Sequence, residues 1–462
     1  MSYQQTMFDK IWEMHLIKKL EDQNDLIAID RIFIHDVCGA FVFKMLDEAK
    51  TVVADNTRIY ATPDHTPATV MGRTGETSKT GKRIMPIFTE GCKKYKIRLF
   101  DLDDPRQGIV HIVCPEIGLS LPGMTIACGD SHTCTHGALG TLSIGLGTTQ
   151  LYHAMTTSCI IAKKPKTMRI RLEGKRRPEI SAMDIILFVL SKLGIEVAVG
   201  YAVEFSGSVV REMSMEDRFT LCNFSVEMGA EYGLISPDEK TIDYIQGREF
   251  APQGEDMDKL IAHCHEIASD KYSVYDKDIV IDITNIERQI SWGINTGQVI
   301  GISGTIPDAK DQKSDKDKDS FLEACSYMDL KPGQNIRRLK VDHVFIGSCA
   351  NGRLSNLVTA ADAIKGRKVA RGVKAVVVPG SMLIKQAAET MGLDKIFSNA
   401  GFIWGMPGCS YCTCSNDEHV ASGSRCVSTT NRNFIGRQGV NVRTHLASPL
   451  TAVLTALSGS IE

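Results

Sequence analysis

Three cysteines that lie far apart in the sequence place the strongest constraint on how this chain folds. Cys409 and Cys412 form a C-x-x-C pair on a Pro-Gly turn within residues 401–416, and Cys349 follows the apolar run 341–346. Two thiols three positions apart can bind one metal centre from a single turn, whereas the third must be brought to them by the fold. We therefore expect two distant segments to meet around one metal centre.

Length and composition indicate a large globular protein of a reducing compartment. The 462 residues are enough for about two to four domains with substantial cores. The net charge is −2 and no long basic block is present, so we expect no nucleic-acid partner. No signal-peptide layout and no apolar run long enough for a bilayer are found, so we expect no membrane partner. Fourteen cysteines without a secretory signal favour a cytoplasmic location.

Hydrophobic periodicity predicts an α/β protein with several domains. The expected helices cover residues 6–20, 181–193 and 214–229, and the expected strands cover residues 26–33, 109–113 and 124–127. Further along, strand and helix alternate at residues 341–346, 354–364, 373–378 and 383–391. The polar, charge-rich stretch 305–320 predicts a solvated loop near a domain junction.

Three motifs are long and specific enough to indicate a family. They read Gly-Ser-Cys-Ala-Asn-Gly-Arg at 347–353, Pro-Gly-Cys-Ser-Tyr-Cys at 407–412 and Ser-Thr-Thr-Asn-Arg-Asn-Phe-Ile-Gly-Arg at 428–437. With them the chain resembles the aconitase superfamily over nearly its whole length, and within it the branch of 3-isopropylmalate dehydratase large subunits.

The resemblance implies an aconitase-like α/β fold of three intertwined α/β/α domains around an iron–sulfur site. Residues 1–290 would form domains 1 and 2 with the acid/base residues. Residues 291–462 would form domain 3 with the cluster ligands and substrate arginines. The small swivelling domain of the superfamily is expected to be absent from this chain.

By the same resemblance, Cys349, Cys409 and Cys412 bind a [4Fe-4S] cluster. Three cysteine ligands leave one iron without a protein ligand, free to act as a Lewis acid. The alternative is a structural zinc site, because Cys414 with the other three would supply four thiolates. The presence of one C-x-x-C pair rather than two counts against zinc.

The resemblance also implies acid and base groups around the leaving hydroxyl. In the loop 129–133, Asp130 and His132 would form a charge-paired unit and Ser131 a substrate contact. His111 and Glu204 match the positions that pair with and orient these imidazoles. A lone histidine is more often a satisfied core or surface residue, but several such elements at motif positions together favour catalysis.

Two further motif positions concern proton donation and substrate contact. Asp64 and His65 match an Asp-His dyad, which is a plausible proton donor to the departing hydroxyl. His35, which follows the expected strand 26–33, matches a position that contacts substrate.

The heptapeptide 431–437 carries two arginines five positions apart. A guanidinium binds a carboxylate through two parallel hydrogen bonds and keeps its proton. We therefore expect Arg432 and Arg437 to bind the substrate carboxylates, with Asn431 near the cluster. A solvated surface pair is the ordinary interpretation of two such arginines outside this motif.

The expected function is that of a hydro-lyase large subunit in leucine biosynthesis. It would interconvert 2-isopropylmalate and 3-isopropylmalate through the dehydrated intermediate. A partner small subunit would carry the swivelling domain, with a serine base and a further substrate arginine. Departures from the usual motifs, such as Gly405 in place of an arginine, leave open the same chemistry on citramalate/citraconate or homoaconitate. A cluster-sensing regulatory binder is a second alternative, which the near-neutral charge disfavours.

Overall fold

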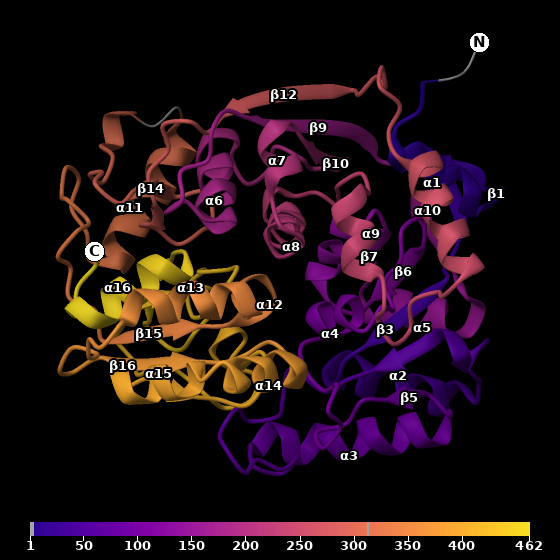
Figure 1. Cartoon of the computed structure of the whole chain (residues 1–462), viewed down its shortest axis with the longest axis horizontal. Coiled ribbons are helices and arrows are strands. Elements are labelled where there is room, and N and C mark those ends of the chain that lie inside the picture. The colour runs from indigo at the N-terminus through magenta and orange to yellow at the C-terminus, as the bar shows by residue number, and fades with distance from the viewer. Residues whose placement is uncertain (1–3, 312–313) are drawn as a thin grey trace. The chain divides into compact units, whose positions relative to one another are not determined.

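The computed structural model describes residues 4–311 and 314–462, and the chain divides into two compact units (Figure 1). Unit 1 comprises Met1–Pro67, Thr74–Lys175 and Glu196–Asp282. Unit 2 comprises Ala68–Arg73, Arg176–Ile195 and Ile283–Glu462. The last crossing between the units lies close to the expected boundary at residue 290, but two earlier segments also belong to unit 2. The division into three domains stays a prediction.

Unit 1 contains a five-stranded parallel sheet in the order β5-β4-β3-β6-β7. Its strands are β3 (Arg31–Ile34), β4 (Ile59–Ala61), β5 (Arg98–Leu99), β6 (Thr125–Cys128) and β7 (Leu142–Gly145). The chain builds outward from β3 to β5 and then returns to add β6 and β7 on the other side of β3. In such a doubly wound sheet, ligands bind where the strand order reverses, beyond the carboxyl ends of the strands. That switch point lies between β3 and β6.

The rest of unit 1 is built from a second parallel sheet, a small antiparallel sheet and helices. The parallel sheet has the order β11-β10-β9-β12, and the antiparallel sheet has the order β1-β2-β8. These strands are β1 (Leu16–Lys19), β2 (Asn24–Ala28), β8 (Cys159–Lys163), β9 (Lys166–Glu173), β10 (Tyr201–Ser206), β11 (Tyr232–Leu234) and β12 (Lys277–Asp282). The helices of the unit are α1 (Met7–His15), α2 (Asp36–Ala49), α3 (Lys79–Lys94), α4 (Val110–Glu116), α5 (Thr148–Thr157), α7 (Ser208–Glu212), α8 (Met215–Asn223), α9 (Glu239–Ile245) and α10 (Glu255–Ile267), with 3₁₀ helices η1 (Glu21–Gln23), η2 (Asn56–Arg58), η3 (Ser131–Leu139) and η4 (Phe224–Met228).

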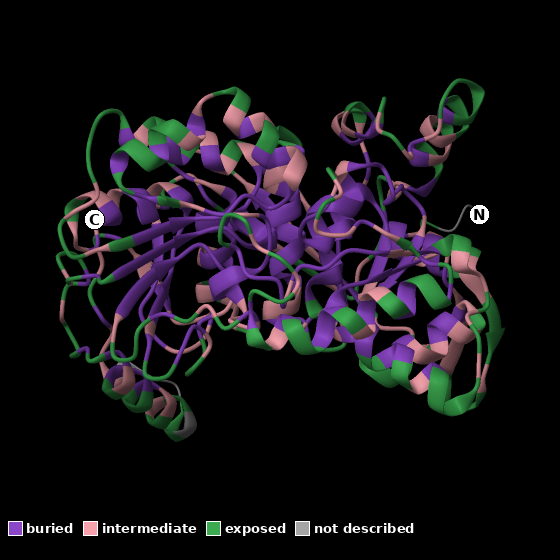
Figure 2. Cartoon of the chain, turned by 90° about the horizontal axis from the view of Figure 1, so that it is seen from below, coloured by how far each residue is buried: buried purple, intermediate pink, exposed green. Residues whose placement is uncertain are grey.

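Unit 2 repeats the doubly wound arrangement with a parallel sheet in the order β17-β16-β15-β18-β19. Its buried strands are visible as purple ribbons in Figure 2. The switch point of this sheet lies between β15 and β18. The strands of the unit are β13 (Gln289–Ser291), β14 (Val299–Gly301), β15 (His343–Ile346), β16 (Lys374–Val377), β17 (Ile403–Trp404), β18 (Arg425–Ser428) and β19 (Arg443–Leu446). Its helices are α6 (Ala182–Leu193), α11 (Asp315–Met328), α12 (Ser348–Asn351), α13 (Leu354–Ile364), α14 (Met382–Thr390), α15 (Leu393–Ala400) and α16 (Pro449–Ser458), with 3₁₀ helices η5 (Ala309–Asp311) and η6 (Ser410–Cys412).

The α/β fold is confirmed, and so are the expected helix 181–193 and the alternation through residues 341–391. Four expectations are wrong at least in part. The strand expected at 109–113 is helix α4, the strand at 26–33 divides into β2 and β3, and the helix expected at 6–20 ends at His15. In the expected loop 305–320, residues 312–313 lie outside the described residues, and α11 begins at Asp315. No helix in the described ranges is both long and apolar enough to cross a membrane.

Candidate functional site

The three cysteines lie in two loops at the carboxyl edge of the unit 2 sheet. Cys349 is in α12, directly after β15, and Cys409 and Cys412 flank Ser410 in the loop that follows β17. All three side chains are buried, at 5–7% exposure. Parallel strands bring these loops to the same edge of the sheet, as the sequence predicted for a shared metal centre.

One side-chain amide connects the two cysteine loops. Asn431, in the loop after β18, donates from Nδ2 to Cys349 Sγ at 3.2 Å. Its Oδ1 accepts from Cys412 Sγ at 3.4 Å. Asn431 itself is fully buried. Two of the three sulfurs therefore converge on one amide, and the set of soft sulfur donors fits an iron–sulfur cluster.

The backbone next to the cysteines adopts conformations that cost energy. Ser348 and Ser410 have φ values of +84° and +48°, in the left-handed region that non-glycine residues rarely occupy. Such strain persists only where the surroundings hold it, and it concentrates at functional sites. Ser348 is held by a hydrogen bond from its Oγ to the carbonyl of Thr429, at 3.1 Å.

Cys414, the candidate fourth thiolate, makes a different contact. Its Sγ donates to the backbone carbonyl of Tyr411 at 3.6 Å. Burial raises the pKa of this thiol to about 12. Cys412 Sγ makes the same kind of contact with the side-chain carbonyl of Asn431, so the three-cysteine centre and the four-thiolate zinc site both stay open.

The two arginines of the 431–437 loop are half-buried. Arg437 places Nη2 4.0 Å from Cys412 Sγ, and its guanidinium lies over the ring of Phe434 at 5.4 Å. Asn433 anchors the loop by donating to the carbonyl of Gly293 at 2.7 Å. The loop therefore carries Arg437 next to Cys412, and the role of the two arginines as carboxylate-binding groups stays a prediction.

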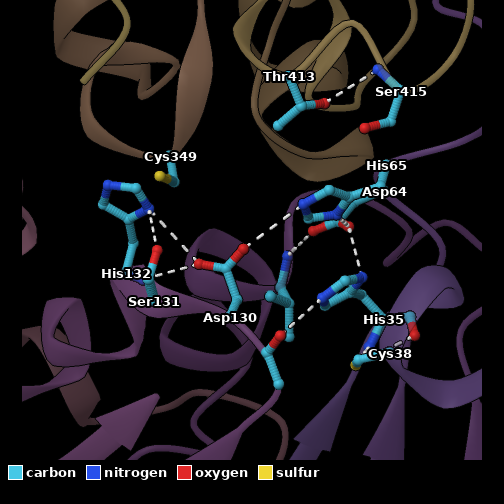
Figure 3. Close-up of polar contacts among 12 residues, drawn as sticks. His35, Cys38, Asp64, His65, Asp130, Ser131, His132, Cys349, Thr413 and Ser415 are labelled. Carbon is cyan, nitrogen blue, oxygen red and sulfur yellow. Dashed lines mark hydrogen bonds and ion pairs between the residues drawn. The ribbon is translucent and has the colours of Figure 1, made fainter. Parts of the chain in front are cut away.

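The acid/base candidates of unit 1 follow the carboxyl ends of β3, β4 and β6, around the switch point of that sheet (Figure 3). Asp64 and His65 form a hydrogen bond between Oδ1 and Nδ1. The other oxygen of Asp64 accepts from the backbone N–H of Val110 at 2.9 Å. Nε2 of His65 lies 3.5 Å from Oδ2 of Asp130. Both ring nitrogens of His65 thus face carboxylates, which suits the doubly protonated imidazolium.

Asp130 is the centre of this network. It is the N-cap of η3 and accepts from the backbone N–H of His132 at 2.7 Å. Nε2 of His111 donates to the same carboxylate at 3.0 Å. Burial alone would raise the pKa of Asp130, but the hydrogen bonds from His111, His132 and His65 outweigh it and hold the pKa well below its usual range.

Two residues that the sequence analysis did not identify orient His111 through its Nδ1 atom. His136 Nε2 lies 3.1 Å from His111 Nδ1, and Ser120 Oγ lies 2.8 Å from His136 Nδ1. With neutral rings, the Ser120 hydroxyl donates to His136, and His136 donates to His111. His111 then donates to Asp130, so the chain of hydrogen bonds selects one tautomer of each ring.

Nε2 of His132 pairs with Glu227 rather than with Glu204, while its Nδ1 lies 3.5 Å from Asp130 Oδ1. His132 Nε2 lies 3.0 Å from Glu227 Oε1, in η4. Glu204, on β10, accepts instead from the hydroxyls of Ser236 at 3.0 Å, Ser269 at 2.7 Å and Tyr275 at 3.0 Å. The expectation that Glu204 orients an imidazole is therefore wrong, because the hydroxyls occupy its oxygens. Glu227 lies within η4, among the largely apolar residues 224–228, and its spacing carries no motif.

His35 is buried behind the dyad. Its ring stacks on that of His65 with centroids 4.0 Å apart, and its Nε2 donates to the carbonyl of Gly129 at 3.3 Å. Burial lowers the pKa of His35, but its interactions with Cys38 and Asp64 outweigh burial and raise the pKa to about 9. Ser131, by contrast, is exposed and free to meet a ligand, with its Oγ 3.5 Å from His132 Nδ1.

Known proteins resemble this chain in both sequence and fold. A model of the aconitase family (aconitate hydratase) matches residues 9–459. The chain is 47% identical over 456 residues to 3-isopropylmalate dehydratase large subunit 1 of Bradyrhizobium diazoefficiens. The matched residues make up 99% of this chain and 95% of that protein. The structure is similar in fold to the crystal structure of holo-form aconitase X from Thermococcus kodakaraensis. That similarity has a TM-score of 0.52 at 12% identity, over 97% of this chain and 95% of that one.

Proposed function

This chain belongs to the aconitase family, and from that premise we propose that it is the large subunit of a hydro-lyase that interconverts 2-isopropylmalate and 3-isopropylmalate through the dehydrated intermediate. The observation that carries the proposal is the half-buried carboxylate of Asp130 with its histidine partners. Loss and re-addition of water requires groups that exchange protons at neutral pH, and imidazoles paired with carboxylates are such groups. The substrate is proposed by analogy with the 47% identical relative, a 3-isopropylmalate dehydratase large subunit.

The proposed cofactor is a [4Fe-4S] cluster held by Cys349, Cys409 and Cys412. When bound, it supplies an iron without a protein ligand, which acts as a Lewis acid toward the leaving hydroxyl. The amide of Asn431 is placed to hydrogen-bond two of the ligand sulfurs. Hydrogen bonds to the sulfurs orient the ligands and tune the cluster.

Proton transfer is assigned to the residues of unit 1. His65, protonated between Asp64 and Asp130, donates its proton to the departing hydroxyl. Asp130 and His132 stabilise the charge that changes during this step, and His111 holds Asp130 in place through Nε2. A carboxylate that stays ionised favours the protonated form of the adjacent imidazole, so it keeps the donor charged.

Recognition of the substrate carboxylates is assigned to Arg432 and Arg437, with Asn431 beside them. A guanidinium matches a carboxylate through paired hydrogen bonds and stays charged at all working pH values. Ser131 and His35 are proposed as further substrate contacts. These cations also stabilise the negative charge that develops when a proton is removed next to a carboxylate.

A small subunit is proposed as the partner, because the relative's name describes a large subunit. It would supply the swivelling domain with a serine base and a further substrate arginine. We place the complex in the cytoplasm, in leucine biosynthesis.

The test is to purify the chain together with its candidate small subunit without oxygen. The complex is then offered isopropylmalate, citraconate and cis-homoaconitate separately, and formation or loss of the unsaturated acid is followed by absorbance. We expect turnover of isopropylmalate and none by the chain alone. Preference for either other acid would move the assignment to that substrate, and inactivity toward all three would overturn the hydro-lyase.

Metal analysis of the same protein tests the cofactor separately. We expect a brown protein with absorbance near ~400 nm, containing iron and acid-labile sulfide in equal amounts. A colourless protein that contains zinc would support the four-thiolate alternative with Cys414.

A further inference from the structure

A short strap from the N-terminal half of the chain is packed into unit 2. The strap is Ala68–Arg73, which unit 2 contains although the residues on both sides belong to unit 1. The carbonyl of Thr69 accepts from the backbone N–H of Met406 at 2.7 Å. Nη1 of Arg73 donates to the carbonyl of Pro407 at 2.6 Å. The strap therefore binds the backbone that leads directly into Cys409.

The side chain that joins the strap to the cysteine turn is Glu418. Its Oε1 accepts from the backbone N–H of Thr69 at 2.7 Å, and its Oε2 accepts from Thr69 Oγ1 at 2.6 Å. The same Oε2 accepts from Ser410 Oγ at 2.7 Å and from Asn416 Nδ2 at 2.8 Å. Ser410 and Thr69 are themselves 2.8 Å apart between their hydroxyl oxygens. The Glu418 carboxylate thus accepts four hydrogen bonds, two from the strap and two from the segment that contains the cysteine turn.

The position of Ser410 makes these contacts relevant to the metal centre. Ser410 stands directly after Cys409, within the C-x-x-C pair, and its φ of +48° is unfavourable for a non-glycine residue. A strained turn needs its surroundings to hold it. Hydrogen bonds to a carboxylate are among the stronger ones in proteins, so Glu418 is well suited to that task.

We propose that Glu418 is a positioning residue for the metal centre, which holds the Cys409–Cys412 turn in its ligating conformation by bonding Ser410 and the strap together. Among the described residues, the Glu418 side chain contacts no residue proposed to bind substrate and no cysteine sulfur. Its effect on the metal centre is transmitted through Ser410 and Thr69. The inference rests on the proposed role of the cysteines as cluster ligands.

The test measures how fast the cluster is lost. Anaerobically loaded protein is mixed with an iron chelator, and the decay of absorbance near ~400 nm is followed. We expect Glu418→Gln and Thr69→Val each to accelerate the loss by about tenfold or more, because each removes hydrogen bonds to a charged group. Thr69→Ser keeps the hydroxyl and is expected to restore the wild-type rate.

The double variant separates one shared network from two independent effects. If Thr69 acts through Glu418, the combination of Glu418→Gln with Thr69→Val will be little faster than either single change. Glu323→Gln, at an exposed glutamate of the same unit, serves as the matched control. The melting temperature of each cluster-free variant is measured in parallel to detect a general loss of stability.

The outcomes distinguish this inference from the proposed function. If the wild-type protein binds no iron–sulfur cluster, the proposed cofactor fails. If the wild type binds it and Glu418→Gln loses it at the wild-type rate, only the positioning role fails. A lower melting temperature of the cluster-free variant with an unchanged rate of cluster loss also overturns the positioning role.

Discussion

At the scale of single residues, Asp130 is the carboxylate on which the acid/base network depends. We expect Asp130→Asn to lower kcat/KM by about 10²–10⁴-fold, the range for loss of positioned proton transfer. The amide keeps the shape of the side chain but removes the charge that favours protonated His65. Steady-state kinetics of the two-subunit complex measure the effect. Asp103→Asn, at an exposed aspartate, is the control; equal rates for the two variants would contradict the role of Asp130.

Glu227 and Glu204 provide a matched pair of variants that tests which of the two glutamates orients His132. Glu227→Gln removes the charged partner of His132, and we expect kcat to fall by about tenfold or more. Glu204→Gln disturbs only the bonds to Ser236, Ser269 and Tyr275. We expect it to lower the free energy of unfolding by about 1–3 kcal/mol with kcat nearly unchanged. The reverse pattern would restore Glu204 as the orienting residue.

His35 predicts a pH dependence of stability. Its pKa in the folded protein is about 9, above the value of about 6.5 in an unfolded chain. Folding therefore favours the protonated form, so this contribution is complete below pH ~6.5 and is lost as the pH rises through about 9. The contribution is on the order of 3 kcal/mol at its maximum.

Urea unfolding of wild type and His35→Gln at pH 6, 7.5 and 9.5 tests this dependence. The difference in unfolding free energy between the two proteins should shrink as the pH rises. Gln253→Ala, at an exposed glutamine that carries no titrating group, should give a difference that does not change with pH. A constant difference for His35→Gln would show that the ring is neutral in the folded protein.

At the scale of elements, the sequence predicted best where local signals and tertiary packing agree. Ser181 and Asp184 form a reciprocal capping box at the start of α6, and the sequence signature placed that helix correctly. Residues 109–113 were expected as a strand, yet they belong to α4, where Val110–Val113 are all buried. A short apolar run that is buried on every side has no period to separate helix from strand.

The difference between local signals and tertiary contacts also explains which site residues could be predicted from the sequence. The cysteines and arginines lie in sequence motifs that are visible without the fold, whereas Glu227 and Glu418 act through contacts made by the fold. Glu418 meets Thr69 across a very large separation in sequence. Only the tertiary structure brings such a pair together.

The cap of α6 yields a stability prediction for this element. Ser181 Oγ accepts from the N–H of Asp184 at 3.2 Å, and Asp184 Oδ1 accepts from Gln289 N at 2.9 Å, which ties the helix start to β13. Ser181→Ala should cost about 1 kcal/mol of unfolding free energy. Ser326→Ala, at an exposed site in α11, should change it by less than about 0.5 kcal/mol. Denaturant titration measures the unfolding free energy of both variants. Equal losses for the two variants would show that the Ser181 cap does not stabilise the helix.

At the scale of the whole molecule, the two units are interleaved in a way that the sequence did not predict. Residues 176–195 lie between two segments of unit 1 but belong to unit 2. Each short insertion joins the other unit only through its tertiary contacts, so the boundary expected at residue 290 captured only the last of the crossings. Each unit nevertheless has its own hydrophobic core, and the core of unit 2 includes Cys412.

Because the two cores are separate, we expect loss of the cluster to destabilise unit 2 and to leave unit 1 unchanged. A ligand stabilises the state that binds it, so its removal should loosen the segments that carry the ligands and their supports. We expect amide hydrogen exchange to rise, by about tenfold or more, in residues 68–73, 347–353 and 405–420 when the cluster is removed by anaerobic chelation. The sheet of unit 1, including β3 and β6, should exchange as before, since its hydrogen bonds and apolar contacts are its own. Mass spectrometry of peptides from the loaded and cluster-free protein measures both sets in one experiment. A uniform rise across both units would mean that the cluster supports the whole chain, whereas no rise in the 405–420 peptides would exclude the cysteine turn as its binding site.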